Sequence, residues 1–246
     1  MKGVRFAITD WAASAPGLPA PSDWQAWADA PARPQGALEA KLEAMPAMQR
    51  RRLNALGRAA AQVAWDCHAP DVEVPVVFAS GHGDSQRCLQ LLKEFAATAA
   101  ASPTDFTFSV HNAIGAMYSI SRSDTASYTS VAAGVASAAA GVVEACALLA
   151  DGAPSVLLVC YDAPLPAEYA QFEQEPAAPY AFAWRVSAAR EDQPHIALTW
   201  TTAEPGSPPR PTELPFGLEV LRFAISQQQE AELHAGGKRW TWSRHA

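Results

Sequence analysis

Few side chains in this sequence could attack a substrate, transfer a proton or bind a metal ion. Cysteines occur at positions 67, 88, 146 and 160, and histidines at positions 68, 82, 111, 195, 234 and 245. No two cysteines form a CxxC pair, and no cysteine has a histidine partner at the spacing of zinc ligands. We therefore expect reduced cysteines that pack as small apolar side chains, with no metal site and no cofactor.

The common nucleotide-binding and hydrolase motifs are incomplete. Gly81 and Gly83 lack the third glycine and the later acidic residue of a dinucleotide site, and a P-loop lysine is absent. Ser137 lacks the tight glycines that push a nucleophilic serine out of a strand-to-helix turn. The sequence therefore supports neither a nucleotide-binding protein nor a serine hydrolase of these classes.

His82 and His111 are the histidines whose surroundings allow a chemical role. His82 lies between two glycines after a predicted strand, where its side chain could face a cleft. His111 precedes Asn112, a residue type that caps helices. A structural interpretation competes with the chemical one for both: His111 would fix a turn by bonding backbone groups, and His82 would be a loop residue. The sequence favours the structural interpretation.

The composition indicates a globular protein and excludes several classes. The 246 residues carry 18 Lys and Arg against 25 Asp and Glu, a formal net charge of −7, and 49% are hydrophobic. That balance excludes disorder and argues against a nucleic-acid partner, because neutralising phosphates requires a concentrated basic face. The concentrated basic residues are Arg50, Arg51, Arg52 and Arg58. They form either a solvated helix face or a surface that attracts an acidic partner.

No segment is predicted to cross or enter a membrane. The first residues, MKGVRFAITDW, do not form the apolar core of a signal peptide, because Asp10 interrupts a short apolar run. Residues 131–150 are long enough to cross a bilayer, but they are mostly Ala and Gly and include Glu144. We therefore expect a cytoplasmic protein with no membrane span, in which residues 134–150 form a buried helix.

Apolar periodicity predicts helices and strands that alternate along the chain. Strands are expected at residues 4–9, 74–80, 128–133, 155–160, 181–188 and 196–202, with a last strand around Trp240 and Trp242. Helices are expected at residues 46–67, after Asp84, after Asn112, at 134–150 and at 218–233. Residues 106–110 are expected to be extended, and 11–34, 163–180 and 203–215 to be irregular. This alternation predicts one α/β domain over residues 1–246, with a mixed, mostly parallel sheet covered by helices on both faces.

Five segments occur in an order and at a spacing that together are specific. They are RRRL at 50–53, SPTDFTFSVHNA at 102–113, SVAAGVASAAAGVVEA at 130–145, Asp151-Gly152, and VLLVCYD at 156–162. Over residues 46–162 this set resembles the N-terminal half of a β-ketoacyl synthase, which has the thiolase fold. In this sequence two of the segments contain SVHNA and SVAAG, and in this form the set is similar to the short ketosynthase-like proteins of aryl polyene and related lipid biosynthesis. The resemblance implies a thiolase-like half and fades after residue 163.

The resemblance also implies where a nucleophile would stand. Active ketosynthases place a cysteine at a strand-to-helix junction, where the helix N-terminus lowers its pKa and backbone N–H groups hold the thioester oxyanion. Counting from the matching segments on either side puts that position at Val135, which cannot be acylated or deprotonated. Cys146 lies about three helical turns further on, too far to substitute. Around this position the resemblance implies a cleft or structural motif of four residues: His111, Asn112, Gly134 and Ser137.

A full ketosynthase has a second half of similar size, which carries two histidines that act in decarboxylation and condensation. After Ala163 this sequence contains His195, His234 and His245, none of them in the glycine-rich settings of that family. Without the nucleophile and the histidine pair, condensation by this chain is not supported, and we expect no catalytic residues.

The resemblance favours a non-catalytic, chain-length-factor-like partner subunit of an acyl-carrier-protein-dependent fatty acid, polyketide or aryl polyene condensing system. Such a subunit would pair with a full-length ketosynthase as a heterodimer, or with a second copy of itself. Thiolase-fold dimers join through the nucleophile-bearing half, so that one sheet continues across both subunits. The acidic carrier protein would be steered by Arg50, Arg51, Arg52 and Arg58. Two alternatives stay open: an acyl-thioester-processing enzyme that uses His111 or His82 with water, and a carrier-protein-binding scaffold.

Overall fold

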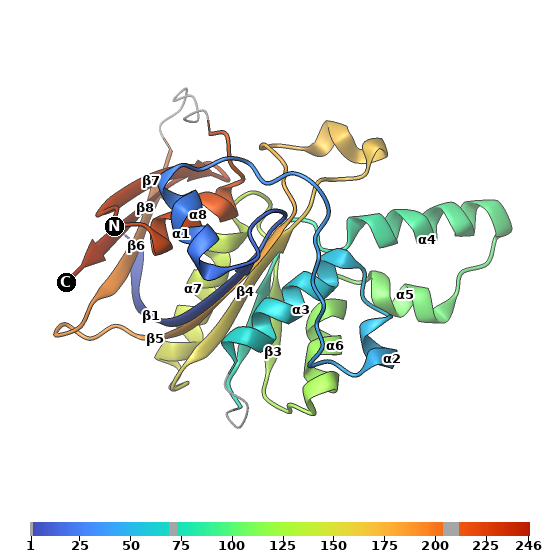
Figure 1. The fold of residues 1–246 in the computed structure, drawn as a ribbon, viewed down its shortest axis with the longest axis horizontal. Helices are drawn as coiled ribbons and strands as arrows, with labels where there is room; N and C mark the ends of the chain where they lie inside the picture. The colour runs from blue at the N-terminus through green and yellow to red at the C-terminus, as the bar shows by residue number, and fades with distance from the viewer. Residues whose placement is uncertain (1, 69–72, 204–211) are drawn as a thin grey trace.

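An eight-stranded sheet runs through the computed structural model, which describes residues 2–68, 73–203 and 212–246 (Figure 1). The strand order across the sheet is β3-β2-β4-β5-β1-β6-β8-β7. In chain order the strands are β1 (Lys2–Ser14), β2 (Val76–Ala79), β3 (Tyr128–Val131), β4 (Val156–Asp162), β5 (Tyr180–Ala188), β6 (His195–Thr202), β7 (Glu230–Ala235) and β8 (Lys238–His245). The helices of the described residues are α1 (Pro21–Asp29), α2 (Ala47–Arg50), α3 (Ala55–Cys67), α4 (Ser85–Thr98), α5 (Pro103–Ser109), α6 (Ala113–Arg122), α7 (Ser137–Ala150), α8 (Phe216–Ile225) and the short 3-10 helix η1 (Ala167–Phe172).

Helices cover both faces of the sheet, as the sequence predicts. Side chains alternate between the faces of a strand. In β4, Leu158 therefore joins the core formed with α7 and α8, whereas Leu157 and Val159 join the core formed with α3 and α6. Burial on both faces explains why β4 is an almost unbroken apolar run in the sequence.

The predicted mostly parallel arrangement of the sheet is wrong. Among the described strands, β2 is parallel to β3 and to β4, and the other five pairings are antiparallel. Parallel strands need a long crossover connection, which α4 to α6 and α7 provide between β2, β3 and β4. The C-terminal strands reverse direction instead. Gly236 and Gly237, with φ angles of 60° and 68°, form the tight turn that joins β7 and β8.

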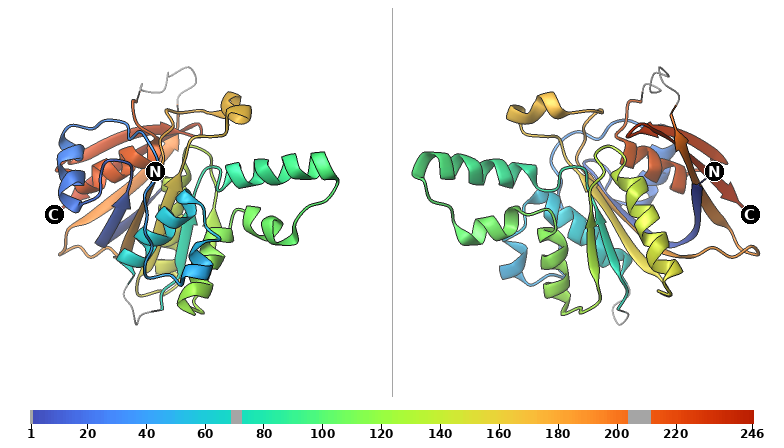
Figure 2. Two further views of the ribbon diagram at one scale, coloured as in Figure 1. Left: turned by 45° about the vertical axis from the view of Figure 1, so that its right-hand side comes forward. Right: turned by 180° about the vertical axis from the view of Figure 1, so that it is seen from behind.

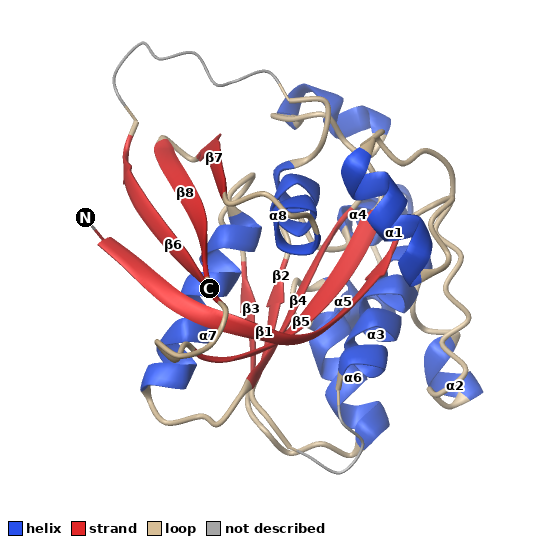
Figure 3. Ribbon diagram, turned by 60° about the vertical axis from the view of Figure 1, so that its left-hand side comes forward, coloured by secondary structure: helices blue, strands red, loops and turns tan. Residues whose placement is uncertain are grey.

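Strand β1 connects the two parts of the sheet. It pairs with β5 over residues 6–14 and with β6 over residues 2–6. A register shift between Ile8 and Asp10 marks an irregularity in its pairing with β5, and the strand curves across the sheet (Figure 3). Such irregularities bend a strand and increase its twist. The parallel strands and the antiparallel C-terminal strands therefore belong to one continuous, strongly bent sheet.

Local capping interactions account for two wrong predictions of secondary structure. The helix predicted over residues 46–67 is two helices, because α3 begins directly after Asn54, whose side chain accepts a hydrogen bond from the Gly57 N–H at 2.8 Å. Residues 106–110, predicted to be extended, lie mostly in α5. The Ser102 side chain caps that helix, and Pro103 occupies its first turn.

The predictions for two longer stretches are also wrong. The helix expected over residues 218–233 ends at Ile225 and is followed by β7, whose alternation of polar and apolar residues has the period of a strand. Arg244 of β8 closes α8 by donating hydrogen bonds at 3.0–3.1 Å to the last carbonyl oxygens, those of Phe223, Ala224 and Ser226. The stretch 11–34, expected to be irregular, contains the end of β1 and all of α1.

Helices α4 and α5 project from the body of the molecule as an arm (Figure 2). The start of α4 is as predicted, since the Asp84 side chain accepts a hydrogen bond from the Arg87 N–H. The apolar side of α4 is only partly buried, however, because Leu91 is buried whereas Leu92 and Phe95 are exposed. On α5, Phe106 is 61% exposed. The arm therefore presents apolar side chains that the rest of this chain does not cover.

Small residues allow α7 to lie very close to the sheet. An added Cβ at Gly141 would stand 2.8 Å from both the Ala79 Cβ and the Leu158 Cδ1. This contact confirms the buried helix predicted for residues 134–150, which begins at Ser137. None of the helices in the described residues is both long and apolar enough to span a membrane.

The close approach of α7 to the sheet predicts a large effect of side-chain volume at Gly141. Gly141→Val should lower the free energy of unfolding by about 1–3 kcal/mol, because the added atoms overpack the contact with β2 and β4. Ala147→Val is the matched control, since Ala147 lies on the exposed side of the same helix. Urea denaturation of both variants measures the difference. A loss at Gly141 no larger than the loss at Ala147 would contradict the close-packing explanation, because helix propensity alone favours valine over glycine.

Candidate functional site at the β3–α7 turn

The turn between β3 and α7 holds Val135 in a fixed position. Gly134 has a φ of 56°, a left-handed conformation that favours glycine, and Val135 forms an isolated bridge with Ala133. The Ser137 hydroxyl donates a hydrogen bond to the Gly134 carbonyl oxygen at 2.7 Å and accepts one from the Ala133 N–H at 2.9 Å. Ser137 is buried, so its hydroxyl holds the turn together and is not presented to a substrate.

A small cavity lies beside Val135, with a volume of about 80 Å³. Its walls include the Gly81-His82 turn after β2, Asp162 at the end of β4, Glu175, and Tyr180 at the start of β5. This volume holds a few water molecules, whereas pockets that bind small ligands usually measure about 300–1,000 Å³. The space beside Val135 is therefore too small for an acyl chain.

Asp162 ties the end of β4 to the turn that follows β2. Its carboxylate accepts hydrogen bonds from the Ser80 hydroxyl at 2.9 Å and from the Gly81 N–H at 3.0 Å. The Ser80 hydroxyl oxygen in turn accepts from the Gly83 N–H at 2.8 Å. Burial raises the pKa of Asp162, and these donors and the nearby His82 oppose the rise. The Asp162 carboxyl is thus committed to holding this turn in place.

A second carboxyl on the cavity wall connects the segment after β4 to α8. Glu175 accepts a hydrogen bond at 2.6 Å from the N–H of Phe216, the first residue of α8. Burial raises the pKa of Glu175 to about 7; the Phe216 N–H opposes this rise, and the negative charges of Asp162 and Glu173 add to it. Because several carboxyls line the cavity, it disfavours an anionic ligand.

His111 makes a backbone contact that supports its structural interpretation. Its Nε2 lies 3.1 Å from the Ser80 carbonyl oxygen, and because a carbonyl only accepts, Nε2 carries the proton. The ring packs against Gly83, where an added Cβ would stand 3.0 Å from the ring. Asn112 precedes α6 as expected, but within the described part of the chain its side chain makes no capping hydrogen bond.

A larger, mainly apolar groove lies between α4 and η1, with a volume of about 570 Å³. Its lining includes His82, Cys88 and His111, together with Tyr169 and Phe172 of η1. His82 and Gln174 also line the small cavity, so the groove and the cavity meet at these two side chains. The sequence offers no signal for this groove, because its lining comes from separate segments brought together only by the fold.

The arginine-rich segment divides into structural and exposed members. Arg50 is half-buried and donates a hydrogen bond to a backbone carbonyl oxygen at 3.0 Å, and Arg58 is half-buried on α3. Arg51 and Arg52 are exposed, and the Arg52 guanidinium lies 5.7 Å from the Phe108 ring centroid. The basic surface that could attract an acidic partner therefore exposes Arg51 and Arg52, two of the four arginines that the sequence suggests.

The remaining cysteines and histidines do not converge on the turn. Burial raises the pKa of Cys146 to about 12 and that of Cys160 well above its ordinary value, so neither is a thiolate. His195, His234 and His245 lie on β6, β7 and β8, at the end of the sheet opposite to β3. Among the described residues, no group of three or more metal-ligating side chains could hold a metal ion.

The carboxyls of this site are absent from the sequence-based predictions. A signal existed for Asp162, because it ends a buried apolar strand, and the carboxyl ends of neighbouring parallel strands meet at one edge of a sheet. Ser80 directly follows the adjacent strand β2 and carries the same signal. Glu175 has no such signal, since it lies in an irregular segment whose position only the fold decides.

Comparison with known families establishes the relationship of this chain to other proteins. The family model for the β-ketoacyl synthase N-terminal domain matches residues 24–243. The chain belongs to this family. The match extends well beyond residues 46–162, where the sequence motifs place the resemblance, and it includes most of the C-terminal strands. No curated protein matches the sequence.

Solved structures of ketosynthases share the fold. A chain from the ketosynthase (ApeO) in complex with its chain length factor (ApeC), from Xenorhabdus doucetiae, is 29% identical with a TM-score of 0.85, and the match covers 98% of this chain and 100% of that one. The ishigamide ketosynthase/chain length factor is 16% identical with a TM-score of 0.62, covering 81% and 67%. The ketosynthase from module 1 of the bacillaene synthase of Bacillus amyloliquefaciens FZB42 is 12% identical with a TM-score of 0.58, covering 82% and 47%. These matches confirm the thiolase-like α/β fold.

The raised pKa of Glu175 predicts a pH-dependent stability for this ketosynthase-like chain. Folding raises the pKa of Glu175 from 4.5 to about 7. The stabilisation of the fold by protonation of Glu175 is therefore fully present below pH 4.5 and is lost as the pH rises through 7. Glu175→Gln keeps an acceptor for the Phe216 N–H and removes the charge. The variant should match the wild type near pH 4 and exceed its free energy of unfolding by about 1–2 kcal/mol near pH 8.

Chemical denaturation at both pH values measures this difference. Glu39→Gln is the control, because Glu39 is exposed and its replacement should change stability little at either pH. If Glu175→Gln shifts stability equally at both pH values, the Glu175 charge is not the cause.

Proposed function

We propose that this chain is a non-catalytic, chain-length-factor-like subunit that pairs with a ketosynthase in an acyl-carrier-protein-dependent fatty acid, polyketide or aryl polyene condensing system. The observation that carries the proposal is the β3–α7 turn. Val135 occupies the position where the family resemblance implies a nucleophilic cysteine, beside a cavity of only about 80 Å³. The carboxyls of Asp162 and Glu175 on its wall also disfavour a substrate that carries a carboxylate.

Among the described residues of this turn and of α7, no side chain supplies a substitute nucleophile. The Ser137 hydroxyl is buried and bonded within the turn. Cys146 lies 11 residues after Val135 by number, which corresponds to about 16 Å along the helix. Its pKa of about 12 keeps it protonated. These observations support a role in shaping a complex rather than in forming bonds.

Strand β3 supports pairing with another chain. Among the described strands it lies at one end of the sheet. The Ser127 and Val131 carbonyl oxygens accept hydrogen bonds from the strand on its inner side. Because backbone groups of alternate residues point to opposite edges, those of Ser130 point to the open edge, which can pair with a strand of another chain. We take this partner to be a ketosynthase, with a self-dimer as the alternative, because the Xenorhabdus relative comes from a ketosynthase–chain length factor complex.

Three further parts of the proposal follow from the same site and fold. Arg51 and Arg52 are exposed where an acidic carrier protein could approach, and Arg50 and Arg58 would contribute mainly through their charge.

The continuous sheet and the long family match support a single domain over residues 1–246. The cytoplasmic location stays a prediction.

Co-expression with a ketosynthase encoded beside this chain tests the proposal. The ketosynthase should copurify with the tagged chain, and mass spectrometry should show a different distribution of acyl chain lengths when the chain is omitted. Failure to copurify, or an unchanged product distribution, would overturn the proposed function. Carrier-protein binding without any effect on the products would favour the scaffold alternative.

Ser130→Pro should abolish copurification with the ketosynthase while leaving the fold intact. Proline removes the N–H at the open edge of β3 but none of the groups that pair with β2. Ser130→Thr is the matched control, because it keeps the N–H and a similar side chain. Affinity purification measures the complex, and thermal unfolding checks the fold. Copurification of the proline variant at the wild-type level would place the interface elsewhere.

The groove between α4 and η1 favours a second candidate, an acyl-thioester-processing enzyme. It gathers His82, His111 and Cys88, a combination that suits nucleophilic or water-mediated attack on a thioester. Under this candidate the wild-type chain should release free thiol from acyl-CoA, and His82→Gln or Cys88→Ser should abolish the release. Release that both variants retain, or no release by the wild type, would reject the candidate.

A further inference from the structure

A separate cavity of about 180 Å³ lies where β1, β5 and β6 meet the C-terminal end of α8. We call it the bulge cavity, and its lining includes Ile8, Trp11, Trp184, Ala224, Ile225 and Arg244. It shares no lining residue with the cavity beside Val135 or with the groove between α4 and η1. Since an apolar cavity of about 150 Å³ can hold one benzene ring, this space suits a ligand with a single ring.

The irregular pairing of β1 with β5 shapes this cavity. In a regular strand, residues three apart point to opposite faces of the sheet. The register shift between Ile8 and Asp10 leaves Thr9 without a partner on β5 and breaks that alternation. Ile8 and Trp11 therefore both line the cavity, although they are three residues apart. Bulges that insert one residue are frequent beside functional sites, because they re-aim a side chain in this way.

Two tryptophans on neighbouring strands line the cavity without closing it. Trp11 stands directly opposite Trp184 in the pairing of β1 with β5, where side chains are usually close enough to touch. In the described part of the chain the two indoles do not stack on each other. Trp184 stacks instead on Phe6, with 6.3 Å between ring centroids, and Trp11 is only partly buried. An aromatic ring in the cavity would lie within reach of both indoles and would cover the accessible part of Trp11.

Trp184 also carries an unused hydrogen-bond donor. Its side chain is fully buried, and its Nε1–H has no acceptor among the described residues. A buried donor without an acceptor is unfavourable, so a ligand that brings an oxygen atom to this indole gains from it.

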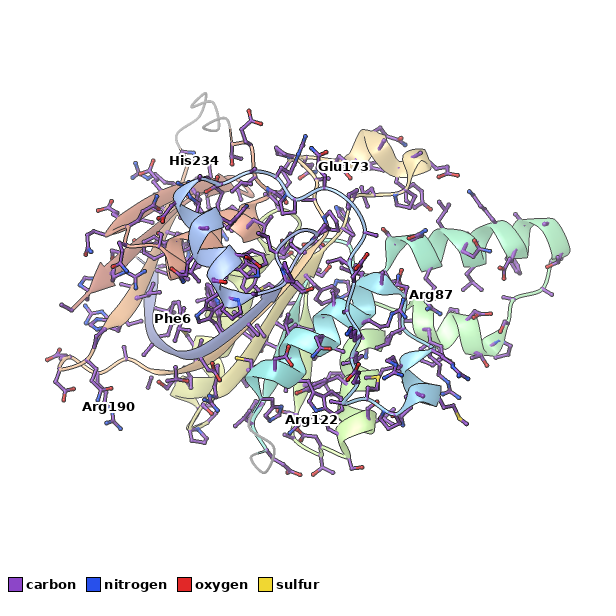
Figure 4. All side chains as sticks on the ribbon, viewed as in Figure 1. Phe6, Arg87, Arg122, Glu173, Arg190 and His234 are labelled. Atoms are coloured by element: carbon purple, nitrogen blue, oxygen red, sulfur yellow. The ribbon has the colours of Figure 1, made fainter. Side chains whose placement is uncertain are left out.

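The charge at the cavity favours an anion. None of the described lining residues is acidic, and Arg244 carries a permanent positive charge. Its Nη2 and Nε donate to backbone carbonyl oxygens at and just after the end of α8, and its Nη1 makes no hydrogen bond or ion pair within the described residues. Arg190 adds no charge to the cavity, because its exposed side chain projects outward from the loop between β5 and β6 (Figure 4). Arg244 can therefore give a carboxylate a charge-assisted hydrogen bond from Nη1.

We infer that the bulge cavity binds a small aromatic carboxylate, with the ring against Trp11 and Trp184 and the carboxylate on Arg244. Such a ligand would tie the end of α8 to β1 and β5 at the point where their pairing is irregular. The site needs no ketosynthase partner and goes beyond the proposed function.

Calorimetric titration of the full chain with benzoate tests the site. Benzoate should bind saturably with one site per chain. Benzyl alcohol keeps the aromatic ring and lacks the charge, whereas cyclohexanecarboxylate keeps the charge and lacks the aromatic ring. Each analogue should bind about tenfold more weakly than benzoate. No saturable binding of benzoate, or binding of either analogue as tight as that of benzoate, would overturn the inference.

Two variants locate the binding. Ala224→Leu should weaken benzoate binding by about tenfold or more, because the larger side chain occupies the cavity, and Trp11→Leu should weaken it by about tenfold, because it removes one indole. Trp65→Leu is the matched control, since Trp65 is also partly buried but lies on α3, outside the cavity, and it should leave binding unchanged. Thermal unfolding checks that each variant is folded. Wild-type binding by either folded cavity variant, or an equal loss in the control, would overturn the site.

Discussion

Hydrogen bonds from Ser80 and Gly81 to the Asp162 carboxylate hold together the strand ends on which the whole site is built. They join the carboxyl ends of β2 and β4, and β3 is fixed beside β2 by the parallel ladder. An added Cβ at Gly81 would stand 3.2 Å from the Gly134 carbonyl oxygen, so the turn after β2 lies directly against the turn that carries Val135. The small cavity, the position of His82 and the start of the arm all follow from this arrangement.

The β3–α7 turn, where the family resemblance implies a nucleophile, is held in shape by its own backbone and by Ser137. Gly134 retains its left-handed conformation, and the Ser137 hydroxyl closes the turn on both sides. The same turn also sets α7 against β2 and β4, where Gly141 allows no added atom. The shape of the turn is therefore required by the packing of the core, whatever residue occupies position 135. This explains how the scaffold of a condensing enzyme persists in a chain that we propose does not condense.

The sequence predicts those parts of the fold that depend on local patterns. The buried strand β4, the small-residue helix α7 and the cap at Asp84 are visible in the sequence because each depends on periodicity or a single residue type. Long-range pairing is not visible in this way. The insertion of β1 between β5 and β6 made the sheet mostly antiparallel, and the closure of α8 by Arg244 of β8 separated a helix from the strand that follows it. The family resemblance could predict Val135 at the strand-to-helix junction and His111 directly before the helix that follows Asn112, whereas the carboxyl of Glu175 depends on the path of an irregular segment.

The central place of β1 in the sheet has a consequence for how the protein is made. The first strand of the chain pairs with β5 and β6, whose residues are separated from it by more than half of the sequence. During synthesis β1 therefore leaves the ribosome long before either neighbour exists, and its two edges stay unpaired until the ends of β5 and β6, residues 188 and 202, have emerged. Such late, non-local pairing slows folding and leaves a strand open to association with other chains. Of the described strands, β1 is therefore the one that waits longest during synthesis for its sheet neighbours.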